Sequence, residues 1–220
     1  MQDKQIKGLV VFDCDSTLSQ IEGVDELAGL KGPAVKQAVE KQTNAAMAGE
    51  IAIKDVFKAR MDVIRPSLAD CQNIGKLYIK HIEPTAKETI EELQRMGFTV
   101  AILSGGFYPV IQPLADFLKI SIIEAVPLFF NKDGSYSGFD EEYPTTRNGG
   151  KTEIIEALKN SLNPPKTIMV GDGISDLETK DAVNLFVGFG KFAERSTVKQ
   201  KADEYIYSLA EIIPLLKKMA

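Results

Sequence analysis

Two carboxylates stand directly after the first apolar run of the chain. Asp13 and Asp15 follow Gly8–Phe12, a run typical of a parallel strand that is covered on both faces. In an extended chain, side chains at positions i and i+2 point the same way, so both carboxylates would face one space. At ~4 Å they would repel by about 4 kcal/mol at an effective dielectric near 20. Either a metal ion compensates them or one holds a proton, and both solutions serve catalysis. Asp also ends strands and starts helices for purely local reasons, which is the alternative.

Two further segments after apolar runs carry groups that suit a phosphate or a metal. Ser104–Gly106 follows Thr99–Leu103, and its hydroxyl and accessible backbone N–H groups suit a phosphate oxygen. Gly171–Asp176 follows Thr167–Val170 and adds two carboxylates, which share a face if the turn opens a helix. Because ligands gather at the carboxyl ends of parallel strands, we expect these segments to converge on one site.

The composition is that of an ordinary soluble globular protein. Hydrophobic residues make up 44% and charged residues 26% of the 220 residues, unlike a disordered chain. A net charge of −5 without a long basic run disfavours a nucleic-acid partner. Two cysteines without a CxxC pair and the single His81 disfavour structural zinc. The sequence shows no signal-peptide core and no apolar stretch of membrane length. We therefore expect a cytoplasmic protein, monomer or homodimer, without a membrane partner.

Alternating β-type and α-type segments predict the fold class. Helical spacing, as in Pro84–Met96 and Lys151–Ser161, separates most of the apolar runs. This alternation predicts an α/β protein with a doubly wound, Rossmann-like parallel sheet. Pro127–Gly138 has Asp-Gly between apolar runs and predicts a small β-hairpin. The predicted sheet strands are Gly8–Phe12, Thr99–Leu103, Ser121–Val126, Thr167–Val170, Asn184–Val187 and Glu204–Tyr207.

One interval breaks the alternation. Residues 21–80 contain no convincing strand, and this stretch is too long for an ordinary crossover. We predict a helical cap domain at residues 19–81, inserted into an α/β catalytic core of residues 1–18 and 82–220. A plain helical appendage is the alternative. The predicted helices of the insertion lie near Val24–Leu30, Pro33–Ala48, Ile53–Ile64 and Ser67–Lys80.

The ordered motifs resemble those of a known enzyme family. Asp13–Thr17, Ser104–Gly106, Lys151 and Gly171–Asp176 are similar to the four motifs of the haloacid dehalogenase superfamily of phosphohydrolases. The resemblance spans nearly the whole chain and implies a doubly wound core, a helical cap inserted after the first motif, and Mg2+ as cofactor. Within the superfamily the chain is most similar to the members that hydrolyse O-phosphoserine. The further matching positions are Glu22, Met47, Arg60, Phe107 and Gly150.

The resemblance also implies a role for each matching residue. Asp13 would be the nucleophile that forms an aspartyl-phosphate, and Asp15 would act first as general acid and then as base. Mg2+ would bind the Asp13 carboxylate, the Asp15 main-chain carbonyl and Asp172. Asp176 would orient Lys151 and metal-bound water. The groups that hold the phosphoryl oxygens would be Ser104, Gly105 and Lys151.

For the substrate, Glu22 and Arg60 carry charges that match the ammonium and carboxylate of phosphoserine. An Arg offers the carboxylate a planar fork, which Lys would not reproduce. Alternatively, Glu22 only favours a helix N-terminus and Arg60 belongs to a solvated helix face. Ser175 departs from the family pattern, in which many members carry Asn. The expected substrate-binding residues are Glu22, Met47, Arg60, Ser104, Gly105, Gly106, Lys151 and Ser175.

The leading hypothesis is therefore a Mg2+-dependent phosphomonoester hydrolase that converts O-phosphoserine to serine and phosphate. The same chemistry on another small phosphomonoester, or phosphoryl transfer to an alcohol, is the nearest alternative. A non-catalytic phosphoamino-acid binding module is a third.

Overall fold

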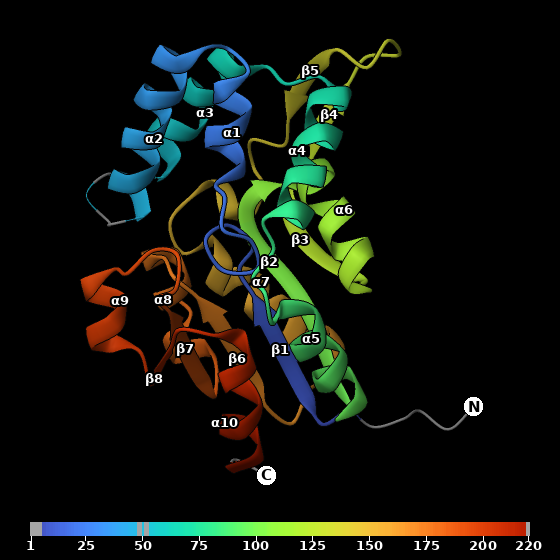
Figure 1. Ribbon diagram of the computed structural model, residues 1–220, viewed down its shortest axis with the longest axis vertical. Coiled ribbons are helices and arrows are strands. Elements are labelled where there is room, and N and C mark those ends of the chain that lie inside the picture. Colours follow the sequence, from blue (N-terminus) through green and yellow to red (C-terminus); the bar gives the residue numbers. More distant parts are fainter. Residues whose placement is uncertain (1–5, 48–49, 51–52, 219–220) are drawn as a thin grey trace.

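A six-stranded parallel sheet forms the centre of the molecule (Figure 1). The computed structural model describes residues 6–47, 50 and 53–218. The strand order is β3-β2-β1-β6-β7-β8, with β1 paired in parallel to both β2 and β6. The predicted fold class is confirmed. The strands are β1 (Gly8–Phe12), β2 (Phe98–Phe107), β3 (Ile122–Val126), β6 (Thr167–Gly171), β7 (Leu185–Phe189) and β8 (Glu204–Ile206).

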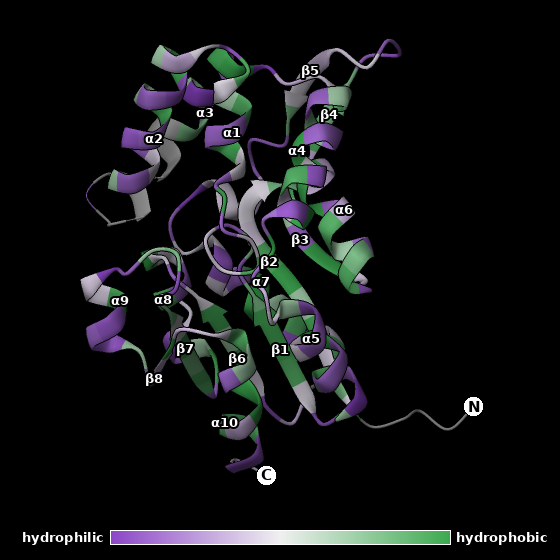
Figure 2. Cartoon of the chain, in the orientation of Figure 1, coloured by the Kyte–Doolittle hydropathy of each residue, from purple (hydrophilic) through white to green (hydrophobic). Residues whose placement is uncertain are grey.

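Helices cover both faces of the sheet, which explains the continuous apolar runs. In β1, Val10 and Phe12 pack into one hydrophobic cluster, and Leu9 and Val11 into the other. All four side chains are fully buried. In Figure 2, most of β1 and the lower part of β2 are accordingly coloured as hydrophobic. The first cluster includes residues of α5 (Ala86–Arg95), α6 (Tyr108–Leu118) and α10 (Ile212–Lys218), and the second includes residues of α7 (Gly150–Leu162), α8 (Ile174–Leu177) and α9 (Ser196–Lys201).

The sheet has its topological switch point between β1 and β6. The chain proceeds from β1 to β2 and β3 on one side, and then returns to place β6, β7 and β8 on the other. Asp13 follows β1 and Asp172 follows β6, so both carboxylates lie at the carboxyl edge beside the switch point. Open α/β sheets bind ligands at this position.

In the described residues, four helices precede α5 in the segment between β1 and β2. α1 (Gly23–Gly29), α2 (Pro33–Met47) and α3 (Ile53–Ile64) stand together above the carboxyl edge of the sheet in Figure 1. α4 (Leu68–Lys80) instead packs along α6 of the core. Gly75 allows this approach, because an added Cβ would lie 2.6 Å from Cγ of Pro113. The helices fall where the sequence predicts them, whereas the exact cap boundaries at residues 19 and 81 stay a prediction.

The predicted hairpin is confirmed. β4 (Leu128–Phe130) and β5 (Tyr136–Phe139) pair antiparallel. Gly134 in the connecting turn has a φ of +81°, a conformation that favours glycine. The backbone N–H of Leu68, at the start of α4, donates to the Gly134 carbonyl at 2.9 Å and so ties the hairpin to α4.

Most predicted strand ends differ from the structure by one or two residues, and the largest difference is at the end of β2. β2 does not stop at Leu103 but continues through Ser104–Gly106 to Phe107, with a register shift on the way. The absence of a side chain at Gly106 lets the strand pass close to Asp15, whose Oδ2 would lie 3.2 Å from an added Cβ. The short 3-10 helices are Pro144–Thr146, Lys180–Ala182 and Leu209–Glu211. Across the described ranges, no helix has both the length and the apolar character to cross a bilayer.

Candidate active site

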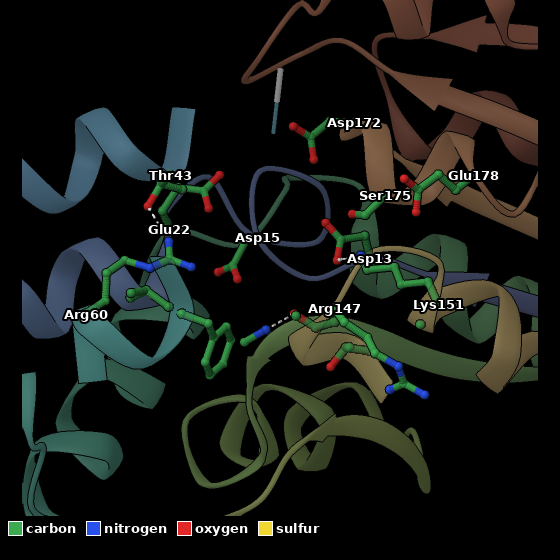
Figure 3. Close-up of a pocket in the computed structure, with 17 residues that line it drawn as sticks. Asp13, Asp15, Glu22, Thr43, Arg60, Arg147, Lys151, Asp172, Ser175 and Glu178 are labelled. Carbon is green, nitrogen blue, oxygen red and sulfur yellow. Dashed lines mark hydrogen bonds and ion pairs between the residues drawn. The ribbon is translucent and has the colours of Figure 1, made fainter. Parts of the chain in front are cut away.

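A pocket lies where the carboxyl edge of the sheet meets α1, α2 and α3. Figure 3 shows Asp13, Lys151 and Ser175 on one side of it and Glu22, Thr43 and Arg60 on the other. The structure thus brings the three predicted motif segments to one place. The lining residues are Asp13, Asp15, Glu22, Val24, Thr43, Phe57, Arg60, Ser104, Gly105, Gly106, Thr145, Arg147, Gly150, Lys151, Asp172, Ser175 and Glu178.

Two predicted residues are not among those that line the pocket. Asp176 lies behind Lys151 and contacts it directly. Met47 is the last residue of α2, and its side chain lies outside the described part of the structure.

Lys151 is buried between two carboxylates. Its Nζ donates to Oδ1 of Asp13 at 2.7 Å and to Oδ1 of Asp176 at 2.6 Å. Gly150 places this lysine, because a Cβ there would lie only 1.7 Å from the carbonyl oxygen of Pro144. The start of α7 can therefore pack closely against the 3-10 helix Pro144–Thr146. Charge-assisted contacts of this length fix the ammonium and both carboxylates relative to one another.

The pocket concentrates negative charge away from water. Burial, followed by repulsion from Asp176, raises the pKa of Asp13 well above its usual value, and Lys151 opposes this. Burial also raises the pKa of Asp172 to about 7; Glu22 and Asp176 add to the shift. Nε of Arg195 lies 2.9 Å from Oδ2 of Asp172 and lowers that pKa. Burial would lower the pKa of Lys151, but the two carboxylates outweigh it and the net shift is upward.

The same carboxylates fit a hard cation. Among the described residues, Asp13, Asp172 and Asp176 each offer a carboxylate oxygen within 4.8 Å of the others. All three side chains are buried, so a cation that joined them would relieve an electrostatic cost. Oxygen donors without sulfur or imidazole suit Mg2+ or Ca2+. The cluster contains Asp176 in addition to the predicted Asp13 and Asp172, and the predicted contribution of the Asp15 carbonyl stays a prediction.

Asp15 has a different environment from Asp13. Its Oδ1 accepts hydrogen bonds from the backbone N–H of Gly23, at 2.9 Å, and from the hydroxyl of Tyr78. Burial raises the pKa of Asp15 well above its usual value, with further contributions from Glu22 and Asp13, whereas Tyr78 and Gly23 lower it. No cation contacts this carboxyl among the described residues. Its surroundings therefore favour the protonated form that a general acid needs.

Ser104 is buried at the irregular end of β2. The backbone N–H of Gly106 donates to its Oγ at 3.0 Å, which fixes the oxygen and leaves the hydroxyl proton for another acceptor. Gly105 lines the pocket beside it, and an added Cβ there would meet only the Thr145 carbonyl oxygen, at 3.9 Å. A phosphate oxygen can approach such a backbone closely.

The opposite wall carries the two charges predicted for substrate recognition. Glu22 precedes α1 but makes no side-chain capping hydrogen bond, and it accepts from Oγ of Ser16 at 2.6 Å. Arg60, in α3, is only 7% exposed, so the alternative of a solvated helix face is wrong. Its guanidinium donates to Oγ1 of Thr43 at 3.2 Å and lies over the Phe57 ring.

Some residues of the site were not found from the sequence. Tyr78 contacts Asp15 from α4, and Arg195 contacts Asp172 from the segment before α9. Oγ1 of Thr17 lies 3.4 Å from Oδ1 of Asp172, and Thr43 contacts Arg60. Thr17 belongs to the predicted first motif, but its contact with Asp172 was not predicted. Tyr78, Arg195 and Thr43 belong to no motif with its own spacing, because only the folded chain brings each one to its partner.

The fold and the site define a class of protein. A doubly wound parallel sheet with acidic side chains and a buried lysine at its switch point is a Rossmann-like α/β core whose groups suit a phosphoryl group. The chain belongs to the haloacid dehalogenase-like hydrolase family, whose model matches residues 8–179.

Known proteins of this family are similar over nearly the whole chain. The phosphoserine phosphatase of Bos taurus is 36% identical over 211 residues, which cover 95% of this chain and 93% of the relative. A phosphoserine phosphatase solved as an analogue of its phospho-aspartyl intermediate aligns with a TM-score of 0.82 at 29% identity, covering 96% of this chain and 99% of that one. A substrate-bound phosphoserine phosphatase complex aligns with a TM-score of 0.82 at 28% identity and the same coverage.

Proposed function

We propose that this protein is a Mg2+-dependent phosphomonoester hydrolase whose substrate is O-phosphoserine. The observation that carries the proposal is that Glu22 and Arg60 line the same pocket as Asp13. A phosphate held at Asp13 would leave the ammonium and carboxylate of the amino acid to the opposite wall. The similarity to phosphoserine phosphatases supports the same substrate.

In the first chemical step, a carboxylate oxygen of Asp13 attacks phosphorus. The ester P–O bond breaks as the new bond forms, which gives an aspartyl-phosphate and the alkoxide of serine. Asp15 donates its proton to that alkoxide and becomes a carboxylate. The similarity to a phosphatase solved as a phospho-aspartyl analogue supports this route.

In the second step, water attacks the phosphorus of the aspartyl-phosphate. The carboxylate of Asp15 takes the proton from this water, and the bond between phosphorus and Asp13 breaks to release inorganic phosphate. Both residues return to their starting states. One carboxyl therefore serves as acid and then as base, a role that a pKa raised above that of an ordinary Asp favours.

The remaining groups stabilise charge on the phosphoryl oxygens. The Ser104 hydroxyl, the Gly105 N–H and the Lys151 ammonium would bind these oxygens, and Asp176 holds Lys151 in place. The residues that would hold Mg2+ are Asp13, the main-chain carbonyl of Asp15, and Asp172. Bound Mg2+ would offset the repulsion between the carboxylates and the incoming phosphate dianion.

We further propose that residues 19–81 form the cap that carries the specificity groups. Glu22 precedes α1 and Arg60 lies in α3, whereas the groups proposed for chemistry lie on the sheet edge or at the starts of α7 and α8. A cap of this kind would select the substrate and exclude water.

The test is release of inorganic phosphate by the purified protein from O-phospho-L-serine and from a panel of small phosphomonoesters at matched concentrations. We expect a strong preference for O-phospho-L-serine, loss of activity with EDTA and recovery with Mg2+. Asp13→Asn keeps the shape of the side chain and should abolish turnover. Activity spread evenly over the panel would refute the substrate, and substantial activity of Asp13→Asn would refute the nucleophile.

A further inference from the structure

Arg60 is held by a chain of two buried polar residues. Oγ1 of Thr43 donates to Oδ1 of Asp25 at 2.7 Å. The same oxygen accepts from Nη1 of Arg60 at 3.2 Å (Figure 3). Asp25 is 6% exposed and Thr43 is 3% exposed. The three residues come from α1, α2 and α3, so the chain of contacts joins all three helices.

The direction of these hydrogen bonds is fixed. A hydroxyl has one proton, and that of Thr43 goes to the Asp25 carboxylate, so its lone pair faces the guanidinium. The Asp25 carboxylate, at the end of this series of hydrogen bonds, polarises the Thr43 hydroxyl and strengthens its contact with Arg60. Burial lowers the pKa of Arg60, whereas Asp25 and Glu22 oppose that shift and so favour the charged guanidinium.

One edge of the guanidinium is left for a ligand. Nε of Arg60 is buried and has no hydrogen-bond partner within the described part of the chain. An unpartnered buried donor costs free energy unless a ligand satisfies it. Because Thr43 engages Nη1, the guanidinium can offer Nε and Nη2 together to a carboxylate, as a bidentate pair.

We propose that Asp25 and Thr43 are positioning residues that orient Arg60 so that its Nε edge receives the substrate carboxylate. This inference rests on the proposed function, because it assumes an amino acid phosphate as substrate. It assigns a purpose to two buried polar residues that take no part in the chemical steps. The specificity of the pocket then depends on three helices and not on Arg60 alone.

The test compares O-phospho-L-serine with O-phosphoethanolamine, which keeps the phosphate and the ammonium but lacks the carboxylate. KM is measured for both compounds, or a competitive inhibition constant where O-phosphoethanolamine turns over too slowly. Thr43→Val removes the hydroxyl at nearly constant volume, and Thr43→Ser keeps it as the matched control. We expect Thr43→Val to raise KM for O-phospho-L-serine about ten-fold, the factor for one lost hydrogen bond to a charged group. The constant for O-phosphoethanolamine and kcat should change less than two-fold, and Thr43→Ser should resemble the wild type.

A second variant tests the carboxylate without removing the contact. Asp25→Asn keeps an oxygen that can accept from Thr43 but cannot carry charge. Burial raises the pKa of Asp25 to about 6; Glu22 and Glu40 also raise it, whereas Thr43 and Arg60 lower it. The constant for O-phospho-L-serine divided by that for O-phosphoethanolamine should therefore rise as the pH falls through about 6 in the wild type. The same ratio should not change with pH in Asp25→Asn. The ratio cancels the titration of the phosphate that both compounds share.

Arg60→Ala, measured in parallel, separates this inference from the proposed function. If Arg60→Ala weakens both compounds equally, Arg60 does not bind the carboxylate and the proposed substrate recognition fails. If Arg60→Ala weakens only O-phospho-L-serine while folded Thr43→Val and Asp25→Asn behave as wild type, the positioning role is refuted and the proposed function stands. A selective loss in all three variants supports both.

Discussion

Gly171→Ala is expected to disable the site through a single added methyl group. Gly171 ends β6, and a Cβ at this position would lie 2.3 Å from Cγ and 2.4 Å from Oδ2 of Asp176. Real Cβ atoms essentially never show contacts under 3.0 Å, so the Asp176 side chain must move. Movement breaks its 2.6 Å contact with Nζ of Lys151 and its 2.9 Å contact with the N–H of Gly173. Lys151 then loses one of the two carboxylates that fix it.

The expected magnitude follows from the size of this displacement. A shift of about 1 Å in a catalytic group costs on the order of 10²-fold in rate, and overpacking of a buried site costs about 1–3 kcal/mol of folding free energy. We therefore expect kcat to fall about 100-fold while the protein stays folded. Phosphate release gives kcat, and thermal unfolding followed by circular dichroism reports the fold.

Gly29→Ala is the matched control for this experiment. A Cβ at Gly29, the last residue of α1, would meet only the flexible side chain of Lys36, at 3.2 Å. Alanine is favoured over glycine in helices by about 1 kcal/mol, so this variant should keep its activity and its stability. Wild-type kcat in Gly171→Ala would show that the position of Asp176 does not matter and would refute the reasoning.

Three further predictions concern the surroundings of the site. Tyr78→Phe removes a neutral donor that lowers the pKa of Asp15, so Asp15 should become a weaker acid. We expect kcat to fall about ten-fold for O-phospho-L-serine but little for p-nitrophenyl phosphate, whose leaving group needs no proton. Equal losses of kcat for the two substrates would contradict this. The folded pKa of Asp25, about 6, exceeds that of an exposed Asp, so the folded state binds more protons between the two values and loses stability as the pH rises through them. Relative to the wild type, Asp25→Asn should therefore gain on the order of 1–2 kcal/mol between about pH 4 and about pH 8 in urea unfolding, and a constant difference would exclude this linkage. Glu141→Gln removes the 2.6 Å ion pair with Lys58, but the two side chains are 53% and 59% exposed, so the unfolding midpoint should not move.

The strands were predictable because a strand that is buried on both faces requires apolar residues at consecutive positions. Gly8–Phe12 is β1 without any change of boundary. The convergence of the motifs was predictable as well, since the carboxyl ends of parallel strands meet at one edge. The continuation of β2 through Ser104–Gly106 was not, because two glycines indicate a turn unless a close neighbour such as Asp15 occupies the space.

The sequence predicted that Asp13 and Asp15 lie together, but it did not show which groups offset the repulsion between the two carboxylates. That depends on partners far along the chain: Lys151 contacts Asp13, and Tyr78 contacts Asp15. Burial raises the pKa of both groups, but the Lys151 ammonium opposes this shift at Asp13, whereas Asp15 has only neutral donors and the repelling charges of Glu22 and Asp13. Two identical groups thus differ in the partner that opposes protonation: a cation at the proposed nucleophile and neutral donors at the proposed acid. The division of roles lies in the tertiary contacts and not in the motif itself.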